Sequence, residues 1–162
     1  MAFDAIIIGG GAAGLMAACT AADRGLRLLL IEKMDQAGRK LRLTGKGRCN
    51  LTNTASLRDT LPHIGSSTAG RSHKPGQSGG LWLRNAYGRF FNQELMQWFE
   101  EHGVPLVEER GGRVFPASGK ALDIFLALIN HLGAVQARRR GAPPPLPVNL
   151  DCRHCTLCPN GK

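Results

Sequence analysis

The chain has 162 residues, 43% of them hydrophobic, and a net charge of +9, which fits one soluble globular domain that faces anions. No apolar run approaches the roughly 20 residues of a membrane span and no leader precedes the first expected strand, so we expect a cytoplasmic protein with no membrane partner. Five cysteines, three of them within the last eleven residues, are too few and too unevenly spaced for a disulfide framework.

The first expected element is a strand over Ala5–Ile8 that leads into a glycine-rich turn. Its three consecutive isoleucines are typical of a strand buried on both faces of a parallel sheet. Gly9, Gly11 and Gly14 follow at the spacing G-x-G-x-x-G. Gly9 would permit the tight turn, Gly11 the approach of a pyrophosphate, and Gly14 the close packing of a helix on the strand.

A helix over Ala12–Asp23, ended by Gly25, and a second strand over Leu28–Ile31 complete a β-α-β unit. Glu32 follows 18 residues after Gly14, where a carboxylate can accept hydrogen bonds from a ribose hydroxyl. The helix N-terminus supplies amide donors and a partial positive charge for phosphates. The sequence therefore predicts a dinucleotide site here, in preference to a glycine-rich turn without a ligand.

The segment Gly38–Asn53 reads GRKLRLTGKGRCNLTN and is expected to be a non-periodic loop over the same crevice. Its backbone amides, with Arg39, Lys40 or Arg48, are candidates to reach the phosphates. The stretch from Gln36 to Gln93 contains ten Lys or Arg residues and one acidic residue. A bound dinucleotide explains this charge more economically than nucleic acid, for which no motif is present. A solvated basic surface remains the alternative for the later arginines.

His63–Gly80 is rich in Gly and Ser and is expected to be a flexible loop. His63 and His73 have no partners at metal-ligand spacing, so no metal is expected there. Leu81–His102 has a helical period, with Asn92 as a cap. Its apolar stripe, which we expect in the core, comprises Leu83, Tyr87, Phe90, Leu95, Trp98 and Phe99.

Pro105–Glu108 and Arg113–Phe115 are expected to pair as a hairpin through Gly111 and Gly112. Ser118 is expected to cap a last helix that runs to Leu132. The expected buried face of that helix comprises Leu122, Phe125, Leu126 and Ile129.

Three stretches, AIIIGGGAAGLMAA, GRKLRLTGKGRCNLTN and GGRVFPASGKALDI, resemble successive signatures of the BaiN-like or YhiN-like FAD-dependent oxidoreductases, also called the aminoacetone oxidase family. The resemblance covers about residues 1–133, and its Gly-Arg-Cys-Asn and Gly-Arg-Val-Phe-Pro runs are more specific than the first glycines. It implies a three-layer α/β Rossmann-like domain with a parallel sheet, here incomplete, that binds FAD. NAD(P)H is a candidate electron donor, and the substrate and catalytic residues are not predicted.

The resemblance assigns two groups of residues to the cofactor. The adenosine and pyrophosphate side comprises Gly9, Gly11, Ala13, Gly14, Glu32 and Lys33. The rest of the cofactor is approached by Arg39, Lys40, Thr44, Gly45, Arg48, Cys49 and Asn50. For Cys49 we favour a packing role over a redox role, because no second cysteine lies nearby in the sequence.

Residues 134–162 do not resemble the family: they hold three consecutive arginines, a proline-rich run and three cysteines. We expect a disordered tail outside the fold, of the kind that a reading-frame change produces. The alternative is a metal site at Cys152, Cys155 and Cys158, which lacks a fourth ligand. Three other functions remain open: an NAD-dependent Rossmann dehydrogenase, against which the Gly-Arg-Cys-Asn run counts, a basic nucleic-acid-binding module, and a non-catalytic remnant.

Overall fold

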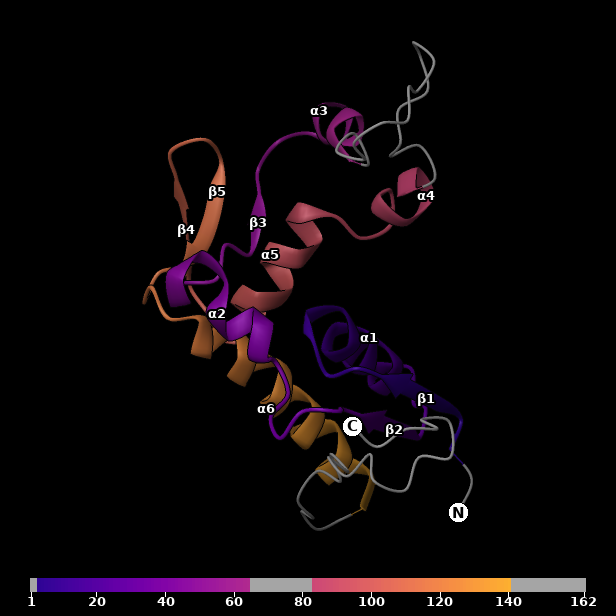
Figure 1. The fold of residues 1–162 in the computed structure, drawn as a ribbon. Helices are drawn as coiled ribbons and strands as arrows, with labels where there is room; N and C mark the ends of the chain where they lie inside the picture. The colour runs from indigo at the N-terminus through magenta and orange to yellow at the C-terminus, as the bar shows by residue number, and fades with distance from the viewer. Residues whose placement is uncertain (1–2, 65–82, 141–162) are drawn as a thin grey trace. The chain divides into compact units, whose positions relative to one another are not determined.

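The computed structural model describes residues 3–64 and 83–140, and its contacts divide the chain into two units. Among the described residues, the first unit combines 3–49 with 118–140, and the second combines 50–64 with 83–117. Figure 1 shows the elements of both units along the chain.

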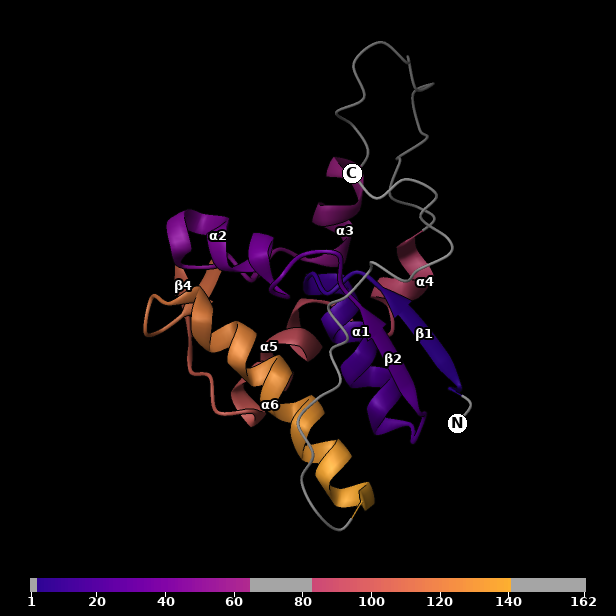
Figure 2. The same cartoon turned by 60° about the horizontal axis from the view of Figure 1, so that its bottom comes forward.

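The first unit contains the expected β-α-β arrangement. Strand β1 (Ala5–Ile8) pairs in parallel with β2 (Leu28–Ile31), and helix α1 (Ala12–Asp23) connects them along one face of the pair (Figure 2). The helix ends in a Schellman motif, because the amides of Gly25 and Leu26 donate to the carbonyls of Ala22 and Ala21. Gly25 has φ +84°, a left-handed conformation that favours glycine.

Two further helices complete this unit, α2 (Arg39–Gly47) and α6 (Ala121–Arg140). Helix α6 packs against both α1 and α2. The side chains that this packing buries most completely are Leu15, Cys19, Ile124 and Leu128. Burying a leucine or isoleucine in this way stabilises the folded state by about 1.5 to 3 kcal/mol. The contact of α1 with α6 therefore forms the core of the unit.

The expected buried face of α6 is wrong at two of its four residues. Leu122 is 46% exposed and Leu126 is 40% exposed, whereas Ile124 and Leu128 are buried. The helix also continues to Arg140, beyond the expected end at Leu132. The expected tail of residues 134–162 thus begins inside α6, and its residues 141–162, with all three of its cysteines, lie outside the described residues. The division at residue 133 stays a prediction.

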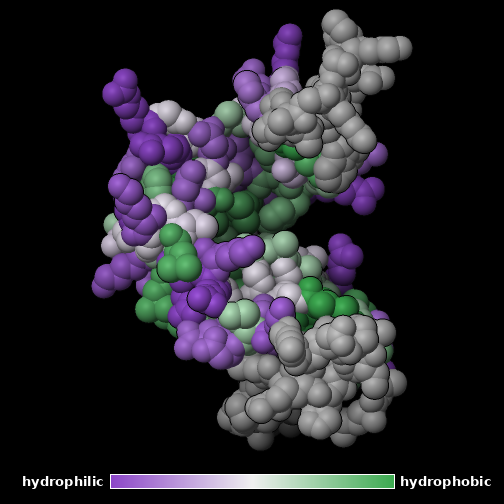
Figure 3. Space-filling view, viewed as in Figure 1, coloured by the Kyte–Doolittle hydropathy of each residue, from purple (hydrophilic) through white to green (hydrophobic). Residues whose placement is uncertain are grey.

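The second unit is built on a three-stranded antiparallel sheet in the order β3-β5-β4. Its strands are β3 (Thr52–Asn53), β4 (Leu106–Glu109) and β5 (Arg113–Pro116). The expected β4–β5 hairpin is confirmed, and its turn places Gly111 and Gly112 at positive φ. Hydrophilic side chains surround the tip of this hairpin (Figure 3).

The helical part of the second unit comprises α3 (Leu57–Thr60), the 3-10 turn η1 (Leu61–His63), α4 (Arg84–Tyr87) and α5 (Asn92–Glu101). Helix α5 packs on β3 and β4 and buries Phe99, but Phe90 of the expected core stripe is 40% exposed. Most of the expected loop over His63–Gly80 lies outside the described residues, as does His73.

Asn92 is not the cap that the sequence suggested. It is the first residue of α5, and its Nδ2 donates hydrogen bonds to the carbonyls of Asn53 at 2.8 Å and Ala55 at 2.9 Å. The cap position is occupied by Phe91, whose amide donates to the Glu94 carboxylate at 2.9 Å. A buried amide that holds the chain at the C-terminal end of β3 accounts for the choice of Asn at this position.

Candidate functional site

The turn between β1 and α1 has the geometry that its three glycines predict. Gly9 has φ +103°, which only glycine adopts readily. A Cβ atom on Gly14 would overlap the carbonyl oxygen of Gly9, so the helix packs directly on the end of the strand. A Cβ atom on Gly11 would meet nothing within 4 Å, and the space beside this residue is open to a ligand.

Glu32, at the end of β2, holds this turn in place. Its Oε2 accepts a hydrogen bond from the Gly10 amide at 2.6 Å, and its Oε1 accepts one from the Met34 amide at 2.9 Å. The predicted bond to a ribose hydroxyl stays a prediction. The two carboxylate oxygens offer about four lone-pair sites, so a hydroxyl can bind beside the amides.

Helix α2 begins at the same turn. The Gly38 amide donates to the Gly10 carbonyl at 2.7 Å, and Gly38 itself has φ +68°. The expected loop over Gly38–Asn53 is therefore helical at its start, with Leu41 buried and with Arg39 and Lys40 exposed. Lys33, between Glu32 and this helix, is exposed as well.

A pocket of about 400 Å³ lies between these elements. It is lined by Gly10, Gly11, Glu32, Met34, Gln36, Gly38, Arg39, Lys40 and Leu43. The lining thus combines the glycine turn at the N-terminus of α1, one carboxylate and two cationic side chains. We call it the dinucleotide pocket.

Sequence reasoning missed the side chains that position one wall of this pocket. Arg42 Nη2 donates to the pocket residue Gln36 at 2.5 Å, and the guanidinium carbon of Arg42 lies 5.2 Å from the centre of the Phe125 ring. A Cβ atom on Gly38 would collide with the same ring. The Phe125 ring belongs to α6, far along the chain, so no local sequence pattern indicated its contacts.

The second half of α2 is interrupted, as the glycine-rich sequence suggested. Thr44 is extended, and Gly45 and Lys46 are left-handed, with φ near +57° and +58°. The chain then turns so that the Cys49 amide donates to the Thr44 carbonyl at 3.0 Å, while Arg48 is half-buried.

Cys49 is buried, and burial raises the pKa of its thiol, so the neutral form prevails near pH 7. Burial, with a smaller effect of Asp23, likewise raises the pKa of Cys19 to about 12. Both thiols are free. A neutral buried thiol agrees with the packing role that we favour for Cys49 and offers no activated nucleophile. Asn50 is exposed and is the first residue of the second unit.

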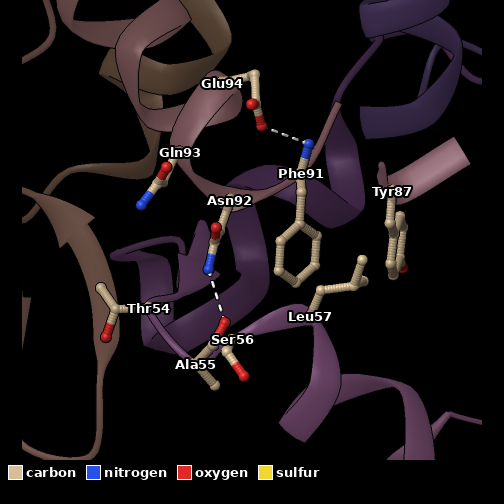
Figure 4. Close-up of a pocket in the computed structure, with 9 residues that line it drawn as sticks. All are labelled: Thr54, Ala55, Ser56, Leu57, Tyr87, Phe91, Asn92, Gln93 and Glu94. Carbon is tan, nitrogen blue, oxygen red and sulfur yellow. Dashed lines mark hydrogen bonds between the residues drawn. The ribbon is translucent and has the colours of Figure 1, made fainter. Parts of the chain in front are cut away.

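The second unit has a pocket of its own, of about 390 Å³, between α3, α4 and the start of α5 (Figure 4). The Tyr87 and Phe91 rings, with centroids 5.0 Å apart, lie on one side, and Thr54 and Gln93 lie on the other. Arg113, a candidate contact by resemblance, donates to the Arg110 carbonyl at 3.1 Å. This contact assigns no functional role to Arg113.

Neither a metal-binding cluster nor a membrane-spanning helix is found in the described ranges. No cluster of three or more His, Cys, Asp or Glu side chains there is arranged to hold a metal ion. No described helix has the length and hydrophobicity needed to cross a bilayer.

Comparison with known proteins identifies relatives over most of the chain. The sequence model of the "HI0933-like protein Rossmann domain" matches residues 3–141. The Escherichia coli "Ribosomal RNA dihydrouridine synthase" is 33% identical over 113 residues, which are 70% of this chain and 25% of that protein. The Clostridium scindens "3-dehydro-bile acid delta(4,6)-reductase" is 32% identical over 121 residues, 74% of this chain and 26% of that one.

Two more comparisons concern a short sequence match and a solved structure. A "KsdD-like steroid dehydrogenase" of Mycobacterium tuberculosis is 56% identical over 34 residues, 21% of this chain and 6% of that protein. The crystal structure of Thermovibrio ammonificans THI4 superposes with a TM-score of 0.48 at 14% identity and covers 82% of this chain and 36% of that one. The chain spans about a quarter of the length of the dihydrouridine synthase and of the bile acid reductase.

Proposed function

Because this chain belongs to the HI0933-like family of FAD-dependent Rossmann-domain proteins, we propose that it binds FAD in the dinucleotide pocket. The observation that carries the proposal is the pocket itself, in which the open side of Gly11 meets the N-terminus of α1, Glu32 and two cations. The fold class expected from the sequence is confirmed by the family match.

The residues present suit the pyrophosphate. Helix α1 has no side-chain cap and no acid in its first turn, so the amides of Ala12, Ala13 and Gly14 are left for a ligand. The partial positive charge of the helix end and the side chains of Arg39 and Lys40 favour an anion there. Lys33 adds a further cation beside the pocket. Thr44, Gly45, Arg48, Cys49 and Asn50 remain proposed contacts for the rest of the cofactor.

The residues also suit the adenosine. In this assignment Glu32 keeps the Gly10 amide at 2.6 Å and accepts a ribose hydroxyl with its remaining lone pairs. The Arg42–Gln36 contact fixes the far wall, so that Gln36 presents one defined orientation to the ligand.

The proposed reaction class is an oxidoreduction with NADH or NADPH as electron donor. FAD, when bound, supplies the hydride chemistry, and the protein supplies binding and orientation. Two relatives, a dihydrouridine synthase and a delta(4,6)-reductase, have names that describe the reduction of a carbon–carbon double bond. We therefore propose a substrate with a reducible double bond. By their names, the two relatives differ in whether an RNA nucleoside or a bile acid carries this double bond. For this chain, the absence of a nucleic-acid partner stays a prediction.

Replacing Glu32 with alanine is expected to weaken FAD binding by about 1 to 3 kcal/mol, or roughly 5- to 150-fold in Kd, because a charged acceptor is lost. Fluorescence titration of the apoprotein measures the change. Asp35→Ala is the matched control, since it removes an exposed carboxylate three residues away. Equal effects of the two substitutions would contradict a specific role for Glu32.

The 162-residue chain alone is expected to reduce flavin slowly, because it spans a quarter of its relatives and a flavin ring needs walls that exclude water. Anaerobic reduction by NADH and by NADPH, followed at the visible flavin band with free FAD as control, measures this. Saturable reduction far above the control would show that these residues suffice for an active site.

A further inference from the structure

The pocket of the second unit differs in its chemistry from the dinucleotide pocket. It is lined by residues 54–57, Tyr87 and residues 91–94, at the start of α5, and we call it the α5 pocket. Its volume of about 390 Å³ lies within the range of roughly 300 to 1,000 Å³ that is usual for small-molecule sites. The two pockets share no lining residue, so the α5 pocket can be considered independently of FAD.

One side of the α5 pocket is aromatic. The Tyr87 and Phe91 rings have centroids 5.0 Å apart and planes inclined by 34°, and the Leu57 side chain lies next to them in Figure 4. Both rings are only half-buried, so part of their surface is open to a further group. Aromatic rings favour offset or edge-to-face neighbours with centroids about 4.5 to 7 Å apart. This side of the pocket therefore suits a planar ring.

The buried side chain of Asn92 supplies a hydrogen-bond acceptor. The residue is only 7% exposed, and its Nδ2 donates to the carbonyls of Asn53 and Ala55, which accept hydrogen bonds and cannot donate them. Asn92 Oδ1 is thus the polar atom left over, and no described residue donates to it. In the described ranges, the fully buried side-chain atom without a partner is Arg42 Nε alone, so Asn92 Oδ1 keeps some exposed surface. A ligand that donates a hydrogen bond satisfies this oxygen.

The charge at the α5 pocket is negative. Among the described residues that line it, Glu94 alone is charged. Its carboxylate accepts a hydrogen bond from the Phe91 amide at 2.9 Å, and this bond lowers the pKa of Glu94. The carboxylate thus already occupies an amide that an anion could otherwise bind at the start of α5. The pocket therefore favours a neutral or cationic ligand over an anionic one.

We propose that the α5 pocket binds a neutral or cationic planar ring that bears an N–H group. The ring packs beside Phe91 and Tyr87, and its N–H group donates to Asn92 Oδ1. The exposed amide of Gln93 offers both a donor and an acceptor to a second polar group of the ligand.

Indole is a suitable probe, because it is planar and neutral and carries one N–H donor. Titration of the isotope-labelled 162-residue chain with indole, followed by NMR, is expected to shift the amide signals of Phe91, Asn92 and Gln93 until they saturate. N-methylindole has the same ring without the donor, and it is expected to bind about three- to tenfold more weakly. Tryptamine, which is a cation, is expected to bind more tightly than the anion indoleacetate. These comparisons use the unaltered chain and do not depend on the folding of a variant.

A pair of variants tests the aromatic side of the pocket. Phe91→Leu keeps the backbone amide that donates to Glu94 but removes the ring, and it is expected to weaken indole binding about three- to tenfold. Phe90→Leu makes the same change at a neighbouring phenylalanine that is 40% exposed and lies outside the lining, and it is expected to leave binding unchanged. The absence of saturable indole binding, equal affinity for indole and N-methylindole, or tighter binding of indoleacetate than of tryptamine would overturn the proposal. Indole binding that Phe91→Leu leaves intact would overturn it as well.

Discussion

Replacing Gly14 with alanine is expected to abolish detectable FAD binding and to lower the free energy of unfolding by about 1 to 3 kcal/mol. The added Cβ atom would overlap the Gly9 carbonyl oxygen and lie 3.0 Å from the carbonyl carbon. Both are backbone atoms of the turn that forms the dinucleotide pocket, so neither can rotate away as a side chain would. Urea unfolding measures the stability, and titration with FAD measures the binding.

Gly11→Ala is the matched control for this prediction. A Cβ atom at Gly11 meets nothing within 4 Å, and the residue is extended, with φ −79° and ψ −172°. The folded state should therefore keep its stability within about 0.5 kcal/mol, while FAD binding falls because the methyl group occupies the space assigned to the pyrophosphate. Equal stability of both variants would contradict the close packing of α1 on β1 at Gly14.

Replacing Gly38 with alanine is expected to destabilise the first unit by about 2 to 5 kcal/mol. The φ of +68° costs a residue with a side chain about 1 to 2 kcal/mol, and overpacking adds about 1 to 3 kcal/mol. The Cβ atom would lie 2.7 Å from Cε2 of Phe125 and closer still to Cδ2. Thermal and urea unfolding measure the loss.

Two further variants separate the causes of this loss. Gly47→Ala has a comparable φ of +84° but meets nothing within 4 Å, so it should cost only the conformational part, about 1 to 2 kcal/mol. Phe125→Leu in the Gly38→Ala background should recover part of the stability, since the smaller side chain relieves the collision. If the stability changes of Gly38→Ala and Phe125→Leu were fully additive in the double variant, the Phe125 ring would not be the obstacle to the added Cβ atom.

The β-α-β unit could be predicted from the sequence because its signals are local. The isoleucine run, the three glycines and Gly25 act through backbone conformation and contacts within one supersecondary element. Gly9 and Gly25 indeed have positive φ, and Gly14 indeed lies against the strand. Such features do not depend on what packs from elsewhere in the chain.

The buried face of α6 could not be predicted, because the helix is apolar on more than one side. Leu122 and Leu126 have the same period as Ile124 and Leu128, and only the positions of α1 and α2 decide which pair is buried. The start of α2 was missed for a similar reason. Its glycines and charges read as a loop, but burial of Leu41 stabilises a helix there.

The sequence indicated some of the residues that line the pocket but not those that position its wall. Gly11, Glu32, Arg39 and Lys40 all line the dinucleotide pocket. The spacing of the motif singled out the first two, and the basic loop and the family resemblance singled out the last two. Their contact with the cofactor stays a prediction. Gln36 depends on a contact from Arg42, which in turn lies on Phe125 of α6. No local pattern encodes a contact between residues so far apart along the chain.

The most direct test of FAD binding is a competitive titration of the purified 162-residue chain with FAD and with NAD, alongside the visible spectrum of the protein as isolated. We predict that the chain binds FAD more tightly than NAD. Asp35→Ala should keep this FAD binding, and Gly11→Ala should lose it. Tighter binding of NAD than of FAD would contradict the assignment and would favour a nicotinamide-dependent dehydrogenase.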